Sequence, residues 1–264
     1  MKIISWNVNG IRAIAKKGLG ETIASLQPDI ICLQEVKANA SQLNDVLTET
    51  LPAYETILLA EASKPGYSGV ATLAKKGLTA PSSSSTDIGL PEFENEGRFN
   101  VLKFSNFLLY NVYLPSGTTS EERQNKKYLC LELFLEHLKS LSQAEQKKLI
   151  ICGDFNICHK AIDIHHPETA EKRKLSGFLP EERAWMDEIV SFGLTDSFRK
   201  LHPKTKDTYS WWTYRAGARE KNLGWRIDYF FIGAMVLPHL KKAEIHSSYP
   251  GSDHCPISIT LKKE

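Results

Sequence analysis

The chain has 264 residues, enough for one large domain or two small ones. Apolar residues make up 42% and charged residues 24%, which is ordinary globular usage and excludes a disordered tail, a coiled coil and a collagen-like chain. Lys and Arg number 33 against 31 Asp and Glu, a net charge of +2. This balance gives no sign of an anionic partner, so any argument for nucleic-acid binding must rest on local clusters.

Neither the N-terminus nor the cysteines suggest export. Residues 1–7 have no signal-peptide layout and lead directly into a predicted strand. No apolar run approaches the roughly 18 residues that a membrane helix needs. The cysteines form no CxxC pair, which favours buried reduced thiols over zinc ligands or disulfides. We therefore expect an intracellular, cytoplasmic protein without a membrane partner.

The predicted elements, in chain order, are mostly short buried strands. Apolar runs bounded by Gly, Pro, Asn and Asp predict strands at 2–8, 30–34, 55–60, 68–74, 100–104, 107–114, 148–153, 227–232 and 256–261. Helical spacing of apolar residues predicts helices at 120–142 and 180–192. Only two residues separate the strands 100–104 and 107–114, so these should form an antiparallel hairpin. We interpret 81–86 and 163–180 as surface loops, and 1–264 as one mixed α/β catalytic domain.

Acids, amides and one histidine lie at the ends of the predicted strands. They include Asn7, Asn9, Glu35, Asp154, Asn156, Asp228, Asp253 and His254. Any one of them alone is typical of a turn or a helix cap. Together with segment 111–115 they mark six strand ends, and six are less easily explained as independent turns. Oxygen ligands without paired His or Cys suit Mg²⁺ or Mn²⁺ rather than zinc. The set predicts metal-assisted hydrolysis.

Nine motifs in order along the chain resemble the exodeoxyribonuclease III-type AP endonucleases of the endonuclease/exonuclease/phosphatase superfamily. They lie at 5–12, 33–35, 66–70, 111–115, 153–156, 176–183, 211–215, 224–229 and 251–256. The superfamily signals alone also fit inositol-phosphate phosphatases, sphingomyelinases and non-specific DNases. The motifs at 176–183 and 224–229 indicate the DNA-repair branch. The resemblance implies a four-layer α/β sandwich of the DNase I type: two mostly antiparallel β-sheets packed face to face, with helices outside.

The resemblance also implies an activity. The enzyme would hydrolyse the phosphodiester 5′ to an abasic site in duplex DNA during base excision repair, leaving a 3′-hydroxyl. It would have 3′-phosphodiesterase and 3′→5′ exonuclease side activities. Its partner would be double-stranded DNA with abasic sites or blocked 3′ ends, its cofactor Mg²⁺ with Mn²⁺ as a substitute, and its state a monomer.

Residue roles follow from the same resemblance. Glu35 would be the principal Mg²⁺ ligand, in a ligand set completed by Asn7, Asp154, Asn156, Asp253 and His254. Asp154 would orient or deprotonate the attacking water, and Asn156 would donate a hydrogen bond to it. His254, oriented by Asp228, would contact the phosphate as an imidazolium. Tyr113 would bind the phosphate or the leaving oxygen. Two alternatives stay open: Asp154 or His254 as the base, and one metal or two.

Segment 211–228 interleaves aromatic and cationic residues, which suits a surface that follows phosphates and stacks against bases. By resemblance, Trp211, Trp225 and Ile227 would wall a pocket for the flipped abasic sugar, and Arg215 would insert into the duplex. The alternative is that the tryptophans belong to the core. The remaining predicted DNA contacts are Asn9, Ser116, Lys172, Arg173, Lys174 and Arg219.

Two positions depart from the family pattern, and two other functions compete with the nuclease. Ser116 stands where the family usually has Asn or Gln, and Asn9 stands where some relatives have an acid. One rival is a phosphatase or phospholipase of the same superfamily, which would not need the aromatic and basic segment. The other is a damaged-DNA binding module without catalysis, which would not need the acids and His254.

Overall fold

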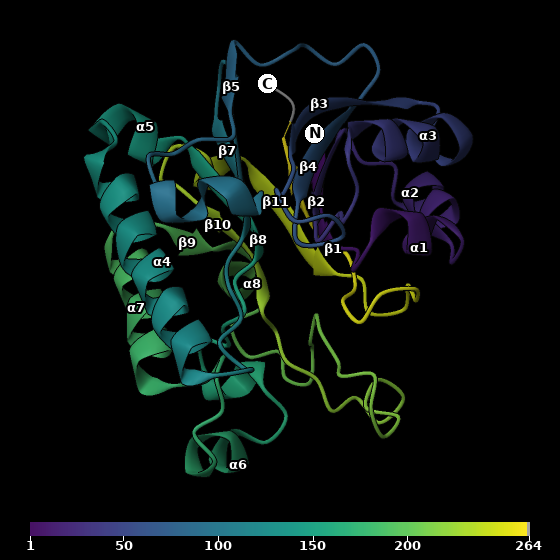
Figure 1. The fold of residues 1–264 in the computed structure, drawn as a ribbon. Coiled ribbons are helices and arrows are strands. Elements are labelled where there is room, and N and C mark those ends of the chain that lie inside the picture. Colours follow the sequence, from purple (N-terminus) through teal and green to yellow (C-terminus); the bar gives the residue numbers. More distant parts are fainter. Residues whose placement is uncertain (263–264) are drawn as a thin grey trace.

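The computed structural model describes residues 1–262 and contains two six-stranded sheets (Figure 1). The first sheet has the strand order β11 (Leu240–Ile245), β12 (Ile257–Leu261), β1 (Lys2–Asn7), β2 (Ile30–Gln34), β4 (Val70–Lys75) and β3 (Tyr54–Ala60). The second has the order β5 (Ser83–Ser85), β6 (Phe99–Lys103), β7 (Leu108–Tyr113), β8 (Leu149–Asp154), β10 (Asp228–Ile232) and β9 (Thr195–Asp196).

Each sheet has one parallel pair among antiparallel ones. β1 pairs with β2 and β7 with β8 in parallel, while β6 and β7 form the expected antiparallel hairpin. A parallel pair needs a long crossover connection. Helices α1 (Ile11–Ala15) and α2 (Leu19–Leu26) supply the first, and α4 (Glu121–Ser140) and α5 (Gln143–Lys147) supply the second. The predicted sandwich of two mostly antiparallel sheets with helices outside is confirmed.

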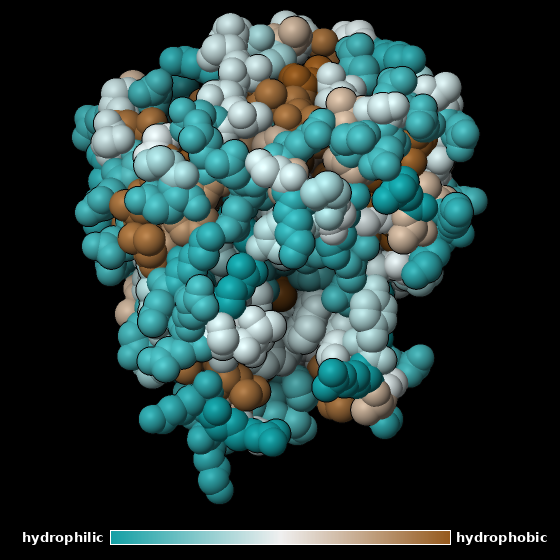
Figure 2. Space-filling view, viewed as in Figure 1, coloured by the Kyte–Doolittle hydropathy of each residue, from teal (hydrophilic) through white to brown (hydrophobic). Residues whose placement is uncertain are grey.

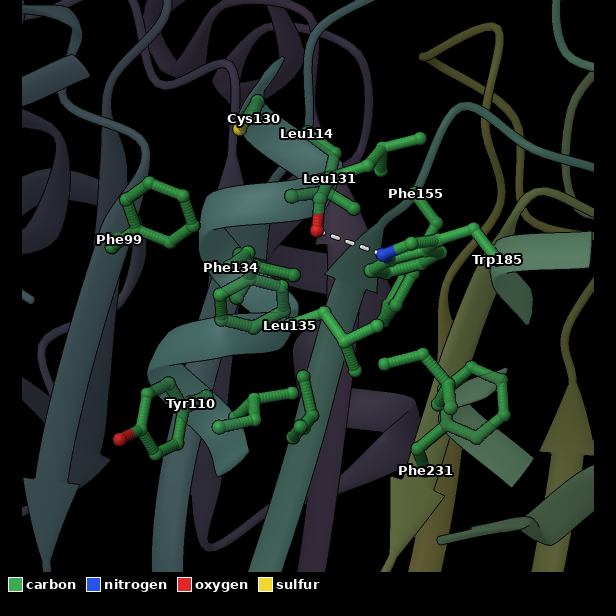
Figure 3. Close-up of a cluster of buried hydrophobic side chains, with 14 of the residues drawn as sticks. Phe99, Tyr110, Leu114, Cys130, Leu131, Phe134, Leu135, Phe155, Trp185 and Phe231 are labelled. Carbon is green, nitrogen blue, oxygen red and sulfur yellow. Dashed lines mark hydrogen bonds between the residues drawn. The ribbon is translucent and has the colours of Figure 1, made fainter. Parts of the chain in front are cut away.

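Three apolar clusters hold the layers together. The sheets face each other across one cluster that includes Ile3, Leu109 and Phe230. A second cluster joins the first sheet to α1, α2 and α3 (Ala40–Thr50). The third joins the second sheet to α4 and α7 (Pro180–Ser191), where Trp185 Nε1 donates to the Leu131 carbonyl at 2.8 Å (Figure 3). All five cysteines are buried and free, as expected.

Several elements differ from the sequence predictions. Segment 81–86 contains the edge strand β5, and 163–180 contains the helix α6 (Pro167–Lys172). Asp163, predicted in a loop, is fully buried because Arg226 and Arg199 form ion pairs with it. The edge strands β9 and β11 and the helices α1, α2, α3, α5 and α8 (Ser197–Leu201) were not predicted. Residues 161–163, 91–96 and 237–239 form 3₁₀ turns.

Edge strand β11 shows why some elements escape the pattern. Its Lys241 and Lys242 are exposed, so the strand lacks the apolar run that marks the central strands. Exposed lysines also protect a sheet edge against pairing with another chain. Within residues 1–262, no helix combines the length and apolar character that crossing a membrane would require.

Candidate active site

The strand ends of the two sheets meet at one pocket of about 720 Å³. Figure 2 shows this face hollowed below its middle, between the segments that Figure 1 draws beneath the sheets. Most of the predicted site residues therefore come together. The lining includes Glu35, Tyr113, Ser116, Asp154, Asn156, Lys174, Trp211, Trp225, Ile227, Asp253 and His254.

Asn7 joins the two sheets at the floor of this site. It ends β1 and is fully buried, and the parallel register sets it opposite Gln34, directly before Glu35. Its Nδ2 donates to Glu35 Oε1 and to Asp154 Oδ2, both at 2.9 Å. Through this nitrogen Asn7 orients both carboxylates, while its Oδ1 accepts the Asn9 backbone N–H at 3.1 Å. An amide binds a cation through its oxygen, so the metal-ligand role of Asn7 stays a prediction.

Lys37 contacts side-chain oxygen atoms of two residues on the side of the first sheet. Its Nζ lies 2.7 Å from Glu35 Oε2 and donates to Asn9 Oδ1 at 2.6 Å. Asn9 Nδ2 donates in turn to Asp253 Oδ1 at 3.0 Å. Burial alone would raise the pKa of Glu35, but Lys37 and the hydrogen bond from Asn7 bring it below its ordinary value. Sequence reasoning missed Lys37, although a lysine two residues after the key acid was a usable signal.

Asp253 is ionised for similar reasons. Burial would raise its pKa, but the charge of His254 and hydrogen bonds from Trp211 and Asn9 lower it overall. Trp211 Nε1 donates to Asp253 Oδ2 at 3.1 Å. The carboxylates of Glu35 and Asp253 and the amide oxygen of Asn9 form a set of oxygen donors without thiolate or imidazole. Hard divalent cations prefer such a set, so these residues fit a metal of the Mg²⁺ type.

A buried acid–histidine–acid row faces this set from the second sheet. His254 Nδ1 lies 2.9 Å from Asp228 Oδ2, and its Nε2 lies 3.7 Å from Asp154 Oδ2. Burial would lower the pKa of His254, but Asp228 and Asp154 raise it to about 10. As an imidazolium, His254 faces both acids as a cation, and its metal-ligand role stays a prediction. Asp154, Asp228 and His254 each bring one possible ligand atom within 4.8 Å of the others, so they are also a candidate metal site.

Asp154 differs from the other acids. Burial raises its pKa to about 7, helped by the charge of Asp228 and opposed by His254. The Asn156 backbone N–H donates to Asp154 Oδ1 at 2.8 Å, and Asn156 Nδ2 donates to the Leu114 carbonyl at 2.9 Å. Asn156 thereby fixes the turn after β8 through its N–H groups, and the predicted contact of its side-chain oxygen with a metal stays a prediction. A carboxyl with a pKa near 7 is suited to accept a proton.

Tyr113 and Ser210 lie next to the two acids of this row, Tyr113 beside Asp154 and Ser210 beside Asp228. Tyr113 lies beside Asp154 in the β7–β8 register, and burial, with the charges of Glu35 and Asp154, raises its pKa well above the ordinary value. It therefore stays a protonated donor. Ser210 Oγ donates to Asp228 Oδ2 at 2.6 Å and accepts from the backbone N–H groups of Ile227 and Asp228, each at 3.1 Å. Sequence reasoning missed Ser210 because nothing in the pattern links it to β10.

An apolar wall lies beside the charged groups. The rings of Trp211 and Trp225 meet edge to face at 6.0 Å, and Ile227 packs in the same cluster. Gly177 lies beneath Trp225, where a Cβ would come within 3.0 Å of Trp225 Cζ3. Trp212, in contrast, is buried in a separate small core cluster, as the alternative interpretation of the tryptophans predicts.

The predicted DNA-contacting cations divide into two groups. Lys172, Arg173, Lys174 and Arg215 are exposed, and Lys174 lines the pocket. Arg219 is partly buried, and its predicted DNA contact stays a prediction. Its guanidinium donates to the carbonyls of Ser247, Tyr249 and Ser252 and stacks over Trp212, so its donors hold the loop before Asp253. Ser116 lines the pocket and shares a hydrogen bond with Thr118 at 3.1 Å.

Comparisons with known proteins agree with this geometry. The chain is 39% identical to the DNA repair nuclease APEX1 of Danio rerio over 99% of its own length and 82% of the relative's. It is 37% identical to an exodeoxyribonuclease of Bacillus subtilis over 99% of both chains. It resembles the crystal structure of the AP endonuclease of Leishmania major with a TM-score of 0.84 and 26% identity, over 100% of this chain and 88% of that one. Residues 4–254 match the profile of the Endonuclease/Exonuclease/phosphatase family, and the chain belongs to that family.

Proposed function

We propose that the protein is a Mg²⁺-dependent AP endonuclease of base excision repair. It hydrolyses the phosphodiester 5′ to an abasic site in duplex DNA, leaves a 3′-hydroxyl, and has 3′-phosphodiesterase and 3′→5′ exonuclease side activities. The proposal rests on one observation: a single pocket is lined by ionised oxygen donors, by the Asp154–His254 pair and by an apolar wall. Relatives named as a DNA repair nuclease and an exodeoxyribonuclease support the same activity.

A phosphodiester resists attack because it is already anionic and its leaving alkoxide is poor. Glu35 and Asp253, with Asn9, would hold Mg²⁺, which supplies neutralisation of charge on the phosphoryl oxygens. The imidazolium of His254, held by Asp228, stabilises the same charge from the other side. Asp154 accepts the proton of the attacking water, because its pKa of about 7 matches that task. Tyr113 donates a hydrogen bond to the departing oxygen or the phosphate.

Substrate selection rests on the apolar wall. Trp211, Trp225 and Ile227 would enclose the deoxyribose of a flipped abasic nucleotide. Flipping costs little there because no base is unstacked, and a snug pocket rejects a nucleotide that still carries its base. Arg215 would insert into the duplex, and Lys172, Arg173 and Lys174 would contact phosphates of double-stranded DNA. We propose that the enzyme works as a monomer, because one chain supplies every group named.

The test uses a labelled duplex with one central tetrahydrofuran abasic analogue, beside an undamaged duplex, each with Mg²⁺ and with EDTA. Cutting directly 5′ of the analogue, with Mg²⁺ only, is the expected result. Shortening of the undamaged duplex from its 3′ ends measures the exonuclease activity. If neither duplex is cut under either condition, the proposal is wrong, and phosphoinositides and phospholipids are the next substrates to try.

A further inference from the structure

A buried ion pair lies behind the pocket, between two helices that take no part in the chemistry. Lys127 on α4 and Glu182 on α7 are both completely buried, and their side chains form a salt bridge. The two helices run side by side outside the second sheet (Figure 1). A charged pair in such a place is costly to desolvate and is weak evidence for stability. Its contacts therefore need another explanation.

Each partner also binds the backbone of a segment that lines the pocket. Lys127 Nζ donates to the Asn156 carbonyl at 2.9 Å. Glu182 Oε2 accepts the N–H of Gly177 at 2.6 Å and that of Leu179 at 3.0 Å. The pair thus ties together the turn after Asp154 and the loop 176–179. Gln124 supports it by donating to Glu182 Oε1 at 3.0 Å.

The two segments have little room to move relative to each other. A Cβ on Gly177 would come within 3.0 Å of the Trp225 ring and 3.1 Å of the Asn156 carbonyl oxygen. Asn156 itself has a positive φ of 53°, in the left-handed region that few non-glycine residues adopt, although asparagine does so more readily than most. Its carbonyl, which binds Lys127, and its N–H, which donates to Asp154 Oδ1, lie on the two sides of one Cα, so the Lys127 contact restrains the residue that carries this N–H.

We infer that Lys127 and Glu182 are positioning residues for the reaction. Lys127 fixes the Asn156 turn and through it the orientation of the Asp154 carboxyl. Glu182 fixes the loop 176–179 against which Trp225 packs. The ion pair links the Asn156 turn to the loop 176–179. It therefore keeps the distance between the Asp154 carboxyl, which accepts the proton, and the Trp225 wall, which selects the sugar, constant. This inference rests on the proposed function.

The test compares Lys127→Met with the unaltered enzyme in single-turnover cleavage of the abasic duplex, with enzyme in excess. At saturating enzyme this rate depends only on the folded molecules, so a lower yield of folded protein does not change it. The saturating rate should fall about ten- to a hundredfold, since small misplacements of a reacting group have costs of that order. DNA binding in EDTA should change little. Leu138→Ala, a cavity variant further along the same helix, is the matched control and should keep the rate.

Lys127→Met leaves Glu182 buried without a partner and is expected to be less stable. The double variant Lys127→Met with Glu182→Gln removes both charges and keeps an acceptor for the backbone N–H groups, so it should fold and show the same loss of rate. A saturating rate equal to that of the unaltered enzyme, in either folded variant, overturns the inference. If neither variant folds, the pair serves stability alone and the inference is also overturned. Failure of the proposed function is distinguishable, because then the unaltered enzyme itself would not cut the duplex.

Discussion

The two sheets contribute acids of opposite character to the same pocket. On the side of the first sheet, Glu35 and Asp253 have pKa values below their ordinary range. On the side of the second sheet, burial raises the pKa of Asp154 to about 7. The carboxyl chemistry is the same, so the neighbours make the difference. In the proposed function, the first set stays anionic to hold a cation, and the second exchanges a proton.

The neighbours responsible are few. Glu35 and Asp253 are linked through Lys37 and Asn9, which supply one positive charge and several donors. Asp154 shares the charge of His254 with Asp228. His254 follows Asp253 in the chain yet acts with the second sheet. The division of labour thus follows side-chain contacts rather than chain order.

The variant with the largest expected effect is Asp154→Asn, which tests the proton-accepting role on the side of the second sheet. The asparagine keeps the shape and the hydrogen bond from Asn156 but cannot accept a proton. We expect the saturating single-turnover rate on the abasic duplex to fall by about 10²–10⁴-fold, the usual contribution of a general base. Asp45→Asn, an exposed change on α3, is the control. A loss of less than tenfold would give the proton-accepting role to another group.

Glu35→Gln tests the other side. The glutamine can keep the contact with Asn7 but removes the charge that a divalent cation requires. We expect the Mg²⁺ concentration for half-maximal cleavage to rise about 10–100-fold, with much of the rate recovered at high Mg²⁺. Glu55→Gln on the exposed face of β3 should leave the Mg²⁺ titration unchanged. An unshifted Mg²⁺ titration for Glu35→Gln would remove Glu35 from the ligand set.

Asp228→Asn removes the negative charge beside His254 and leaves the shape of the side chain nearly unchanged. Asp228 raises the pKa of His254 and accepts its Nδ1–H, so its loss should weaken the imidazolium without disturbing the pocket wall. We expect the cleavage rate to fall about tenfold, the lower end of what orienting partners of a histidine contribute. Binding of the abasic duplex in EDTA, measured by fluorescence anisotropy, should stay near normal. Loss of binding would instead indicate a structural role.

The sequence was sufficient to locate the polar residues at the strand ends. It was not sufficient to predict the contacts that these residues make with one another. Asn7, Glu35, Asp154 and His254 could be found because each follows or precedes a buried apolar run. What each residue does depends on partners far away in the chain. Asn7 bonds Asp154 across 147 residues, so this bridge between the two sheets had no local signal.

Buried charge was the other source of error. Asp163 in a predicted loop and Lys127 within a predicted helix look solvated in the sequence, because Asp and Lys are rarely buried unless paired. Their partners, Arg226 and Glu182, lie 63 and 55 residues away. Arg219, a cation among aromatics, also bonds the backbone of its own chain, a contact that the sequence did not indicate. Long-range ion pairs of this kind leave no periodic pattern.

A second histidine sharpens the comparison, because there burial outweighs the charge of a nearby carboxylate, Glu244. His246 bonds Ser258 at 2.8 Å, and burial, with the charge of Lys2, lowers its pKa from 6.5 to about 4. As the pH falls below 6.5 the unfolded chain takes up a proton that the folded chain refuses until about pH 4. Folding stability is therefore lost across that window.

His246→Gln should remove this loss, because glutamine does not titrate and can still bond Ser258. Between about pH 7.5 and about pH 5, the unaltered protein should lose roughly 2–4 °C more in Tm than the variant, as about 1 kcal/mol does in a chain of this size. The effect is small because His246 is partly exposed and solvent screens it. Equal losses in the two proteins would mean that burial does not oppose the charge at this position. The raised pKa of His254 could then not be credited to Asp228 and Asp154 overcoming burial.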